Sequence, residues 1–202
     1  MKIALVGATG NVGTRIIAEA TARGHTITAI ARNVSSLAAN DKVSAKQGDI
    51  TDPATAEALK GHDCVILSVR FQDFDFDKAL ATLRASAVSR VLIVGGAASL
   101  EVAPGQVLLD TPDFPDFIKP EAEPARQALN QLRGVTDLDW VFLSPSVFFG
   151  PGERTGKFRL GGDNLLTAED GKSHISYEDY AVALLDEIEM PAHHRARFTV
   201  GY

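Results

Sequence analysis

The sequence predicts a single α/β domain built on a Rossmann-like, doubly wound parallel sheet. Short apolar runs alternate along the chain with segments of helical periodicity, which is typical of repeated βαβ units. A glycine-rich segment, residues 7–13, follows the first apolar run and opens the first helical segment. The length of 202 residues, with 45% hydrophobic and 23% charged residues, is that of one globular domain spanning 1–202.

The first half of the chain is expected to contain five strands separated by three helices. Each strand is a short, mainly apolar run, and the runs lie at residues 2–6, 26–31, 43–47, 64–69 and 90–94. The continuous apolar run at 64–69 is typical of a strand buried on both faces. The helices are expected at residues 11–22, 54–59 and 78–88. Gly24 follows the first helix as a stop signal, and Pro53 precedes the second.

The second half is less regular. The segment from Gly95 to Pro115 has no period and is too long for an ordinary connection, so it is either functional or mobile. The turn-rich segment 151–156 is interpreted as a hairpin. Residues from about 145 to 202 are expected to form a small irregular cap on the substrate side, at the carboxyl ends of the strands. Further elements are expected as helices at 121–132 and 177–188 and as strands at 139–143 and 197–200.

Composition excludes several classes of protein. The net charge of −6, from 20 basic and 26 acidic residues, argues against a nucleic-acid partner. A single cysteine, Cys64, excludes an intramolecular disulfide and a cysteine-rich zinc site, and it is expected to be an inert core thiol. Adjacent His193 and His194 point apart, so no metal site is expected.

No apolar run approaches the ~20 residues of a membrane span, and the N-terminus does not resemble a signal peptide. A cytoplasmic protein that does not bind membranes is expected.

The glycine segment predicts a phosphate-binding loop. Gly7 permits a tight turn, Gly10 lets the backbone approach a pyrophosphate, and Gly13 allows close packing of helix on strand. The N–H groups at the start of the helix favour the anion. The spacing is G-x-x-G-x-x-G rather than the standard G-x-G-x-x-G, and the alternative is a purely structural turn. The predicted cofactor contacts in this segment are Gly7, Thr9, Gly10, Asn11, Val12 and Gly13.

Residues after the second strand indicate which dinucleotide binds. An NAD site usually has an acidic residue about 20 positions beyond the loop, which binds the ribose hydroxyls. Here the strand ends at Arg32 and Asn33, without a carboxylate. The guanidinium of Arg32 suits a 2′-phosphate, which favours NADP(H) over NAD(H). A solvated loop cation is the alternative, and Arg15 is a weaker candidate to assist the phosphate.

Five segments of the chain carry a resemblance to one family, and they lie at residues 7–13, 48–52, 95–97, 151–156 and 175–181. They resemble the atypical short-chain dehydrogenase/reductase superfamily. The chain is most similar to its NADH-flavin reductase group, also described as NAD(P)-binding or NmrA-like proteins, and the resemblance covers essentially the whole chain. It implies that Asp49 contacts the adenine edge and that Ile50 packs on the adenine face, with a turn residue or the start of a helix cap as the alternative for Asp49.

The remaining cofactor contacts are predicted from position. Ser68, Val69 and Arg70 end the fourth strand and are expected on the ribose and pyrophosphate side. Pro145 and Ser146, with Phe148, follow the sixth strand, where the nicotinamide end is expected.

The Tyr-x-x-x-Lys pair typical of the superfamily is absent. The residues four positions after Tyr177 and Tyr180 are alanine and leucine, and no tyrosine precedes the helix at 121–132. Reduction of a ketone needs a positioned proton donor, so the usual carbonyl chemistry is not expected. Hydride transfer to a flavin or quinone depends mainly on placing the acceptor against the cofactor. A flavin is therefore expected as a substrate rather than as a bound cofactor, and no catalytic residue is assigned.

Four residues are candidates for contact with the acceptor. Arg154 is expected to hold an anionic group, with a hydrogen bond from Thr155, while Ser99 and Phe148 are expected near the acceptor. The structural alternatives are a surface arginine on a hairpin and a solvated loop hydroxyl. Two other functions stay open: a non-catalytic NAD(P)-sensing regulator of the NmrA type, and a sugar-nucleotide epimerase or dehydratase-like protein. The sequence assigns neither an oligomeric state nor the acceptor.

Overall fold

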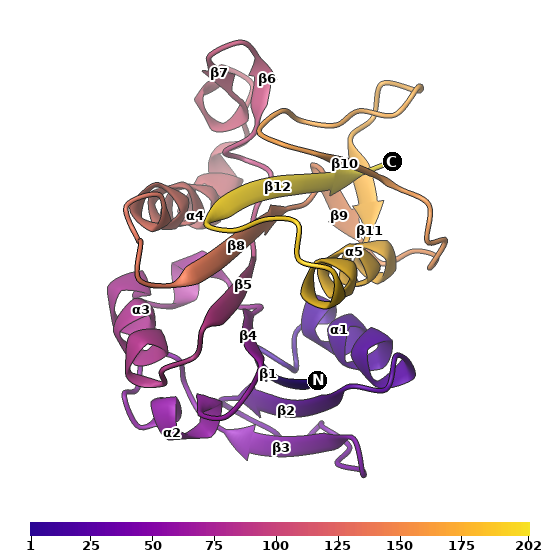
Figure 1. Ribbon diagram of the computed structural model, residues 1–202. Coiled ribbons are helices and arrows are strands. Elements are labelled where there is room, and N and C mark those ends of the chain that lie inside the picture. Colours follow the sequence, from indigo (N-terminus) through magenta and orange to yellow (C-terminus); the bar gives the residue numbers. More distant parts are fainter.

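A computed structural model describes all residues, 1–202, and its centre is an eight-stranded sheet (Figure 1). The strand order is β10-β12-β8-β5-β4-β1-β2-β3, and every pair is parallel except β10 with β12. This topology confirms the predicted doubly wound α/β class. The strands are β1 (Lys2–Val6), β2 (Thr26–Ala31), β3 (Val43–Gln47), β4 (Cys64–Leu67), β5 (Arg90–Val94), β8 (Asp139–Ser144), β10 (Arg159–Gly161) and β12 (Ala196–Gly201).

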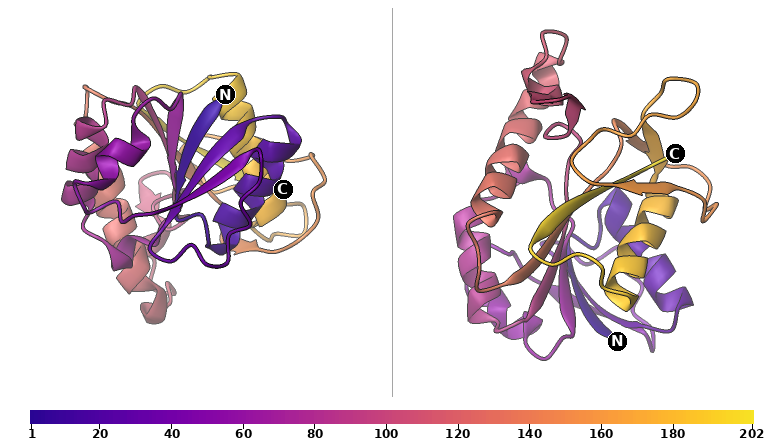
Figure 2. Two further views of the ribbon diagram at one scale, coloured as in Figure 1. Left: turned by 90° about the horizontal axis from the view of Figure 1, so that it is seen from below. Right: turned by 45° about the horizontal axis from the view of Figure 1, so that its top comes forward.

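Helices cover both faces of the sheet, as Figures 1 and 2 show. On one face lie α1 (Asn11–Ala22) and α5 (Tyr177–Glu189), and on the other lie α2 (Thr55–Leu59), α3 (Phe76–Ala85) and α4 (Lys119–Leu132). Successive strand residues point to opposite faces, so Ile3 and Leu5 join one core cluster while Ala4 and Val6 join the other. The parallel strands are apolar on both faces because both faces are covered.

The strand order reverses beside β1. The chain first builds β1, β2 and β3 toward one edge, and then crosses over to β4 on the other side of β1. In such sheets the crossovers diverge at this point and leave a crevice at the carboxyl ends of β1 and β4. The glycine segment leads directly out of β1 into this region.

Element boundaries differ from the prediction where side chains cap or interrupt an element. The fourth strand ends at Leu67 instead of residue 69. Helix α3 begins two residues earlier than expected because the carboxylate of Asp75 accepts a hydrogen bond from the N–H of Lys78. It also ends three residues earlier, at Ala85, just before Ala87 adopts a left-handed φ of 56°.

The long segment after β5 has regular structure that the sequence pattern did not reveal. It forms a hairpin of β6 (Glu101–Ala103) and β7 (Gln106–Val107), followed by the 3-10 turns η2 (Leu108–Asp110) and η3 (Asp116–Ile118). In Figure 1 the hairpin lies at the top of the molecule, beyond the ends of the central strands.

The predicted hairpin at residues 151–156 is wrong. The preceding strand β9 (Phe148–Gly150) pairs in parallel with β11 (His174–Ser176), and the following strand β10 joins the main sheet. The loop between them is held by the fully buried carboxylate of Asp179, which accepts hydrogen bonds from the Thr155 hydroxyl (2.5 Å) and the Gly156 N–H (2.8 Å). A buried carboxylate needs such donors. The conformation of the loop is therefore determined by these contacts with α5 and not by the turn preferences of residues 151–156.

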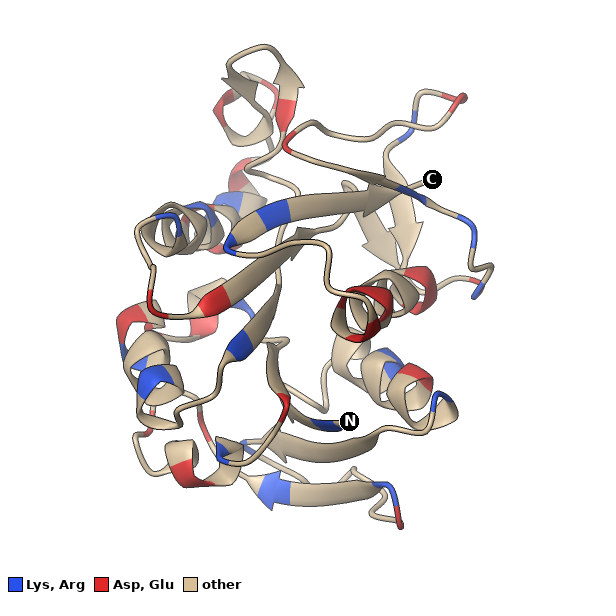
Figure 3. Ribbon diagram, in the orientation of Figure 1, with Lys and Arg blue, Asp and Glu red and all other residues tan.

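The C-terminal residues contribute to the central sheet and to one of its helix layers. Helix α5 packs beside α1, and β12 pairs with β8 inside the main sheet. Figure 3 shows acidic positions along α5 beside basic positions of α1. Arg23 of α1 accordingly bridges Asp186 and Glu189, both at 2.8 Å.

Two further features follow from burial and length. Cys64 is buried in β4, as expected of a core thiol, and burial raises the pKa of this thiol to about 12. None of the helices combines the length and the apolar composition that crossing a membrane requires.

Candidate functional site

A cleft runs along the carboxyl ends of the parallel strands. It consists of two hollows, of about 600 Å³ and 300 Å³. Both are lined by Thr9 and Gly10 from the glycine segment and by Ser68, Val69 and Arg70 after β4. The hollows therefore adjoin at the strand-order reversal, where ligands bind in open α/β sheets.

The three glycines of the loop differ in how strongly the fold requires them. Gly7 has a φ of +84°, and a Cβ atom there would lie 2.0 Å from the carbonyl oxygen of Ser68. A Cβ on Gly13 would lie 2.4 Å from the carbonyl oxygen of Gly7. A Cβ on Gly10 would meet only that same oxygen, at 3.3 Å. The fold itself thus requires Gly7 and Gly13, while the space at Gly10 is left open toward the cleft.

The N-terminus of α1 presents main-chain N–H groups that have no partner in the protein. The N–H groups of Asn11, Val12 and Gly13 meet no acceptor of the protein, and the N-cap Gly10 has no side chain to cap them. The first turn also contains no acidic residue. The positive end of the helix dipole and these free donors fit a pyrophosphate lying over Gly10. The residues of this loop therefore fit a dinucleotide.

The smaller hollow suits the adenosine half of such a ligand. Arg32 follows β2, is exposed, and its guanidinium makes no hydrogen bond or ion pair within the protein. Opposite, Asp49 accepts hydrogen bonds from the N–H (2.9 Å) and hydroxyl (2.8 Å) of Thr51. The Thr51 N–H lowers the pKa of Asp49, and the charge of Arg32 contributes to this shift. Asp49 is therefore both the turn residue and a wall of the hollow, and one of its oxygens remains free.

The larger hollow extends beyond the glycine loop into an apolar chamber. Residues with little or no side chain, Gly95 to Ala97, form its base after β5. Pro145 and Ser146 follow β8 on one side. The segment after β5 forms a roof over this chamber, and we call residues 98–118 the roof segment. It contributes the apolar side chains Leu108, Phe114 and Ile118, which face Ala122 and Ala125 of α4.

The structure brings most of the predicted site residues into this one cleft. Gly13 lies behind the loop, where it packs α1 against the chain leaving β1. The predicted residues that line the cleft are Gly7, Thr9, Gly10, Asn11, Val12, Arg32, Asp49, Ile50, Ser68, Val69, Arg70, Ser99, Pro145 and Ser146.

Three predicted substrate residues lie outside the cleft. Phe148 is 66% exposed, and its neighbour Phe149 lines the cleft instead, because successive residues of β9 point to opposite sides. Arg154 donates two hydrogen bonds to Glu19 of α1, at 2.7 and 2.8 Å. The Thr155 hydroxyl is bound to Asp179. Arg154 and Thr155 therefore attach the loop to the two helices rather than facing an acceptor.

Sequence reasoning also missed Tyr177, the first residue of α5. Its ring lines the large hollow and meets Phe149 edge-to-face, with centroids 4.7 Å apart. Arg15 lies over the ring, 5.7 Å from its centroid, and donates to Glu178 at 3.0 Å. Arg15 thus belongs to the α5 side and not to the hollow that contains Arg32. The available signal was the Ser-x-x-Asp cap at residues 176–179, which places residue 177 at a helix start.

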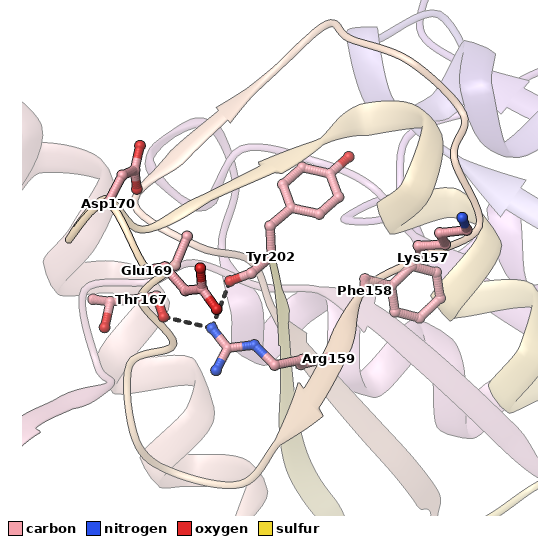
Figure 4. Close-up of a pocket in the computed structure, with 8 residues that line it drawn as sticks. Lys157, Phe158, Arg159, Thr167, Glu169, Asp170 and Tyr202 are labelled. Carbon is pink, nitrogen blue, oxygen red and sulfur yellow. Dashed lines mark hydrogen bonds between the residues drawn. The ribbon is translucent and has the colours of Figure 1, made fainter.

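Other candidate features lie away from the cleft. A separate hollow of about 710 Å³ lies between β10 and residues 167–170 (Figure 4). There the guanidinium of Arg159 donates to the carbonyl oxygens of Thr167 (2.5 Å) and Tyr202 (2.6 Å), so its hydrogen bonds remain inside the protein. His193 and His194 bind two different carboxylates, those of Glu187 and Asp139, at 2.7 and 2.9 Å.

Comparison with known proteins agrees with this geometry. A family model described as NAD(P)H-binding matches residues 7–191. The uncharacterized protein YwnB of Bacillus subtilis is 40% identical over 99% of this chain and 98% of its own. A solved structure of a candidate epimerase from Bacteroides thetaiotaomicron has a TM-score of 0.93 at 40% identity, covering 100% of this chain and 96% of the other. A candidate NADH-flavin reductase from Streptococcus pneumoniae has a TM-score of 0.89 at 36% identity, covering 100% and 99%.

The matched segment includes the glycine loop, the roof segment and helix α5, and hence nearly the whole cleft. The free donors of α1, the open space at Gly10 and the position of the cleft all suit a nicotinamide dinucleotide. On these grounds the chain belongs to the NAD(P)H-binding family.

Proposed function

We propose that the protein is an NADPH-dependent reductase that transfers hydride to a planar conjugated acceptor, a flavin or a quinone. The observation that carries the proposal is the two-part cleft. One part has the features of a dinucleotide site, and the other continues past it into an apolar chamber. Bound NADPH supplies the hydride. The likeness to a protein named for NADH-flavin reduction supports the same class of acceptor.

The shape and lining of the chamber favour a flat, apolar acceptor. Its lining includes glycine and alanine after β5 and two further alanines on α4, and such small side chains leave room for a flat ring. Leu108, Phe114 and Ile118 would cover the ring and exclude water. Arg126 of α4 also lines the chamber and could meet a polar or anionic edge of the acceptor.

Arg32 carries the preference for NADPH within this proposal. Its guanidinium is free of protein partners and lies in the hollow assigned to the adenosine half. A planar guanidinium binds a phosphate through paired, charge-assisted hydrogen bonds. No carboxylate ends β2, where an NAD-binding site would place one.

The test is a combined binding and turnover assay. Purified protein is mixed with NADPH or NADH and with FMN, FAD, riboflavin or menadione, and absorbance at the nicotinamide band is followed. Acceptor-dependent oxidation of NADPH above the protein-free rate is expected. Dinucleotide binding is measured in the same preparation by fluorescence.

Arg32→Glu is expected to weaken NADPH binding by about tenfold to a hundredfold, because charge-assisted hydrogen bonds to the 2′-phosphate are replaced by repulsion. Binding of NADH is expected to change little. Lys46→Glu is the matched control, since Lys46 pairs with Ile30 on the neighbouring strand but does not line the cleft. Equal weakening of both dinucleotides by Arg32→Glu would remove the 2′-phosphate assignment.

One observation favours a second candidate function, a non-catalytic sensor of the dinucleotide. Phe117, beside the chamber residue Ile118, is 84% exposed, and Phe148, between the cleft residues Val147 and Phe149, is 66% exposed. Exposed apolar side chains form a contact surface where they lie together in one patch. Tight binding of NADPH without turnover of any acceptor would favour this sensor over the reductase.

A further inference from the structure

The cleft contains one group that can act as a proton donor to an acceptor. The other polar groups around the large hollow are already hydrogen-bonded or are poor proton donors. The hydroxyl of Ser146 donates to the carbonyl oxygen of Val200 at 3.1 Å. Glu121 uses both carboxylate oxygens to accept the N–H groups of Phe71 and Gln72, at 2.8 and 3.0 Å. Arginine side chains keep their protons, and aliphatic hydroxyls are far weaker acids than a phenol. Tyr177 is the remaining group.

The hydroxyl of Tyr177 is free, unlike those of the other two tyrosines. Tyr180 is fully buried and donates to the carbonyl oxygen of Leu143 at 2.7 Å. Tyr202 is bound to Asp179 at 2.7 Å and to Ser176 at 2.9 Å. Burial raises the pKa of both Tyr180 and Tyr202. The Tyr177 hydroxyl meets no hydrogen-bonding partner in the protein, and its ring lines the cleft.

The ring of Tyr177 is also held in place. Phe149 contacts it edge-to-face, and the guanidinium of Arg15 lies over it. Glu178, the next residue, fixes this arrangement by accepting from both Arg15 (3.0 Å) and the N–H of Gly152 (2.9 Å). The helix start that carries Tyr177 is therefore tied to α1 on one side and to the loop after β9 on the other.

We propose that Tyr177 is the proton donor of this reductase and gives its phenolic proton to the acceptor oxygen or nitrogen on which negative charge develops. This inference rests on the proposed function. The hydride brings two electrons and one hydrogen, and the broken O–H bond of Tyr177 brings the second proton, so the acceptor gains two electrons and two protons. Water at the cleft opening then returns a proton to the phenolate. The fixed charge of Arg15 faces the ring while it is negative.

The proposed arrangement differs from a Tyr-x-x-x-Lys pair, in which both residues come from one helix. Here the phenol is the first residue of α5 and the cation belongs to α1. Sequence spacing alone cannot detect such a pair, because the two residues are far apart in the chain.

The test compares the wild-type protein with Tyr177→Phe and Tyr202→Phe. Each variant deletes one hydroxyl and keeps the ring, but only Tyr177 lines the cleft. Turnover of menadione with NADPH is measured from neutral to alkaline pH. Tyr177→Phe is expected to lower kcat by about tenfold, which is less than the full contribution of a general acid, because a flavin or quinone anion also takes protons from water. The NADPH dissociation constant, measured by fluorescence, is expected to stay within about twofold, because the ring remains.

A second readout does not depend on turnover. Nitration by tetranitromethane, mapped by mass spectrometry, is expected to modify Tyr177 before Tyr180 and Tyr202, because its phenol alone is free. NADP⁺ together with menadione is expected to protect it.

The outcomes separate the two proposals. Wild-type turnover with equal kcat and an unchanged pH profile in Tyr177→Phe would overturn the proton-donor role and leave the reductase intact. Nitration of Tyr177 that NADP⁺ and menadione do not slow would also overturn it. Binding of NADPH by the wild type without turnover of any acceptor would refute the reductase, and the proton-donor role with it.

Discussion

At the residue scale, the glycine loop contains two glycines that the fold requires and a third that it does not require. Gly7 and Gly13 are required by close contacts with the backbone, whereas Gly10 has an ordinary φ of −73° and little around it within the protein. A glycine that the folded chain does not itself require, placed over free N–H groups, indicates that the space belongs to a bound molecule.

This distinction makes Gly10→Ala informative. The melting temperature is expected to change little, because alanine tolerates this backbone conformation and its Cβ would contact only one carbonyl oxygen, at 3.3 Å. The dissociation constant for NADPH is expected to rise by about tenfold or more, because the methyl group occupies the position of the pyrophosphate. Thermal melting and fluorescence titration measure the two effects.

Gly13→Ala is the matched control, because its Cβ would lie 2.4 Å from a carbonyl oxygen and is expected to lower the melting temperature clearly. If Gly10→Ala binds NADPH as the wild type does, the pyrophosphate does not lie over this loop.

At the scale of elements, α1 and α5 are joined by charges that also hold the loop after β9. Glu19 of α1, only 7% exposed, accepts hydrogen bonds from Arg154 of that loop and from Arg23 of its own helix. The hydrogen bond from Arg154 is the main reason that the pKa of Glu19 is lowered below its ordinary value of 4.5. The sequence motif around Arg154 is thus explained by packing of elements rather than by contact with the acceptor.

A lowered carboxyl pKa has a defined pH signature. The folded protein gains stability from ionised Glu19 above pH 4.5, and loses it as the pH falls through the lowered value. Glu19→Gln is therefore expected to reduce the free energy of unfolding by about 1–2 kcal/mol at neutral pH. The difference from the wild type is expected to shrink below pH 4.5. Urea unfolding at several pH values measures it.

Glu57→Gln serves as the control. Glu57 of the short helix α2 is 76% exposed and pairs only with Lys60, the residue that follows this helix. A Glu19→Gln difference that stays constant from neutral to acidic pH would contradict the assigned role of the ionised carboxylate.

At the scale of the whole molecule, the chamber depends on how the roof segment is attached to the core. On one side, Arg126 of α4 bridges Asp110 of η2 at 2.6 Å. On the other, the N–H of Glu101 donates to the carbonyl oxygen of Asp163 at 2.8 Å, and Arg197 binds the side chain of the same aspartate. Surface ion pairs contribute little to global stability, but they can determine how often a segment opens.

Asp110→Asn is therefore expected to change the free energy of unfolding by less than about 1 kcal/mol while increasing amide hydrogen exchange in residues 98–118. The catalytic efficiency toward the acceptor is expected to fall several-fold, because the chamber loses a defined roof. Glu123→Gln is the control, since Glu123 pairs with the same Arg126 from within α4 and does not touch the roof segment. Unchanged exchange in Asp110→Asn would show that this ion pair does not hold the roof.

The sequence by itself determined the strands and helices of the first half of the chain, the elements α4, β8, α5 and β12, and the position of the glycine loop. These features depend on local periodicity and on glycine chemistry, which neighbouring residues in the chain carry. The residues that follow the parallel strands could also be predicted to meet, because their carboxyl ends lie at one edge of the sheet. Arg32, Ser68 and Ser146 were found in this way, whereas Asp49 was found through the family resemblance.

Only the tertiary structure decided which residues line the larger hollow. Arg154 lies outside the cleft because it binds Glu19, a buried residue more than a hundred positions earlier in the chain. Phe149 lines the cleft in place of Phe148 because successive residues of β9 point to opposite sides. Tyr177 and Arg15 come together only because α5 packs on α1. Such pairings depend on burial and on long-range contacts, and neither composition nor spacing along the chain encodes them.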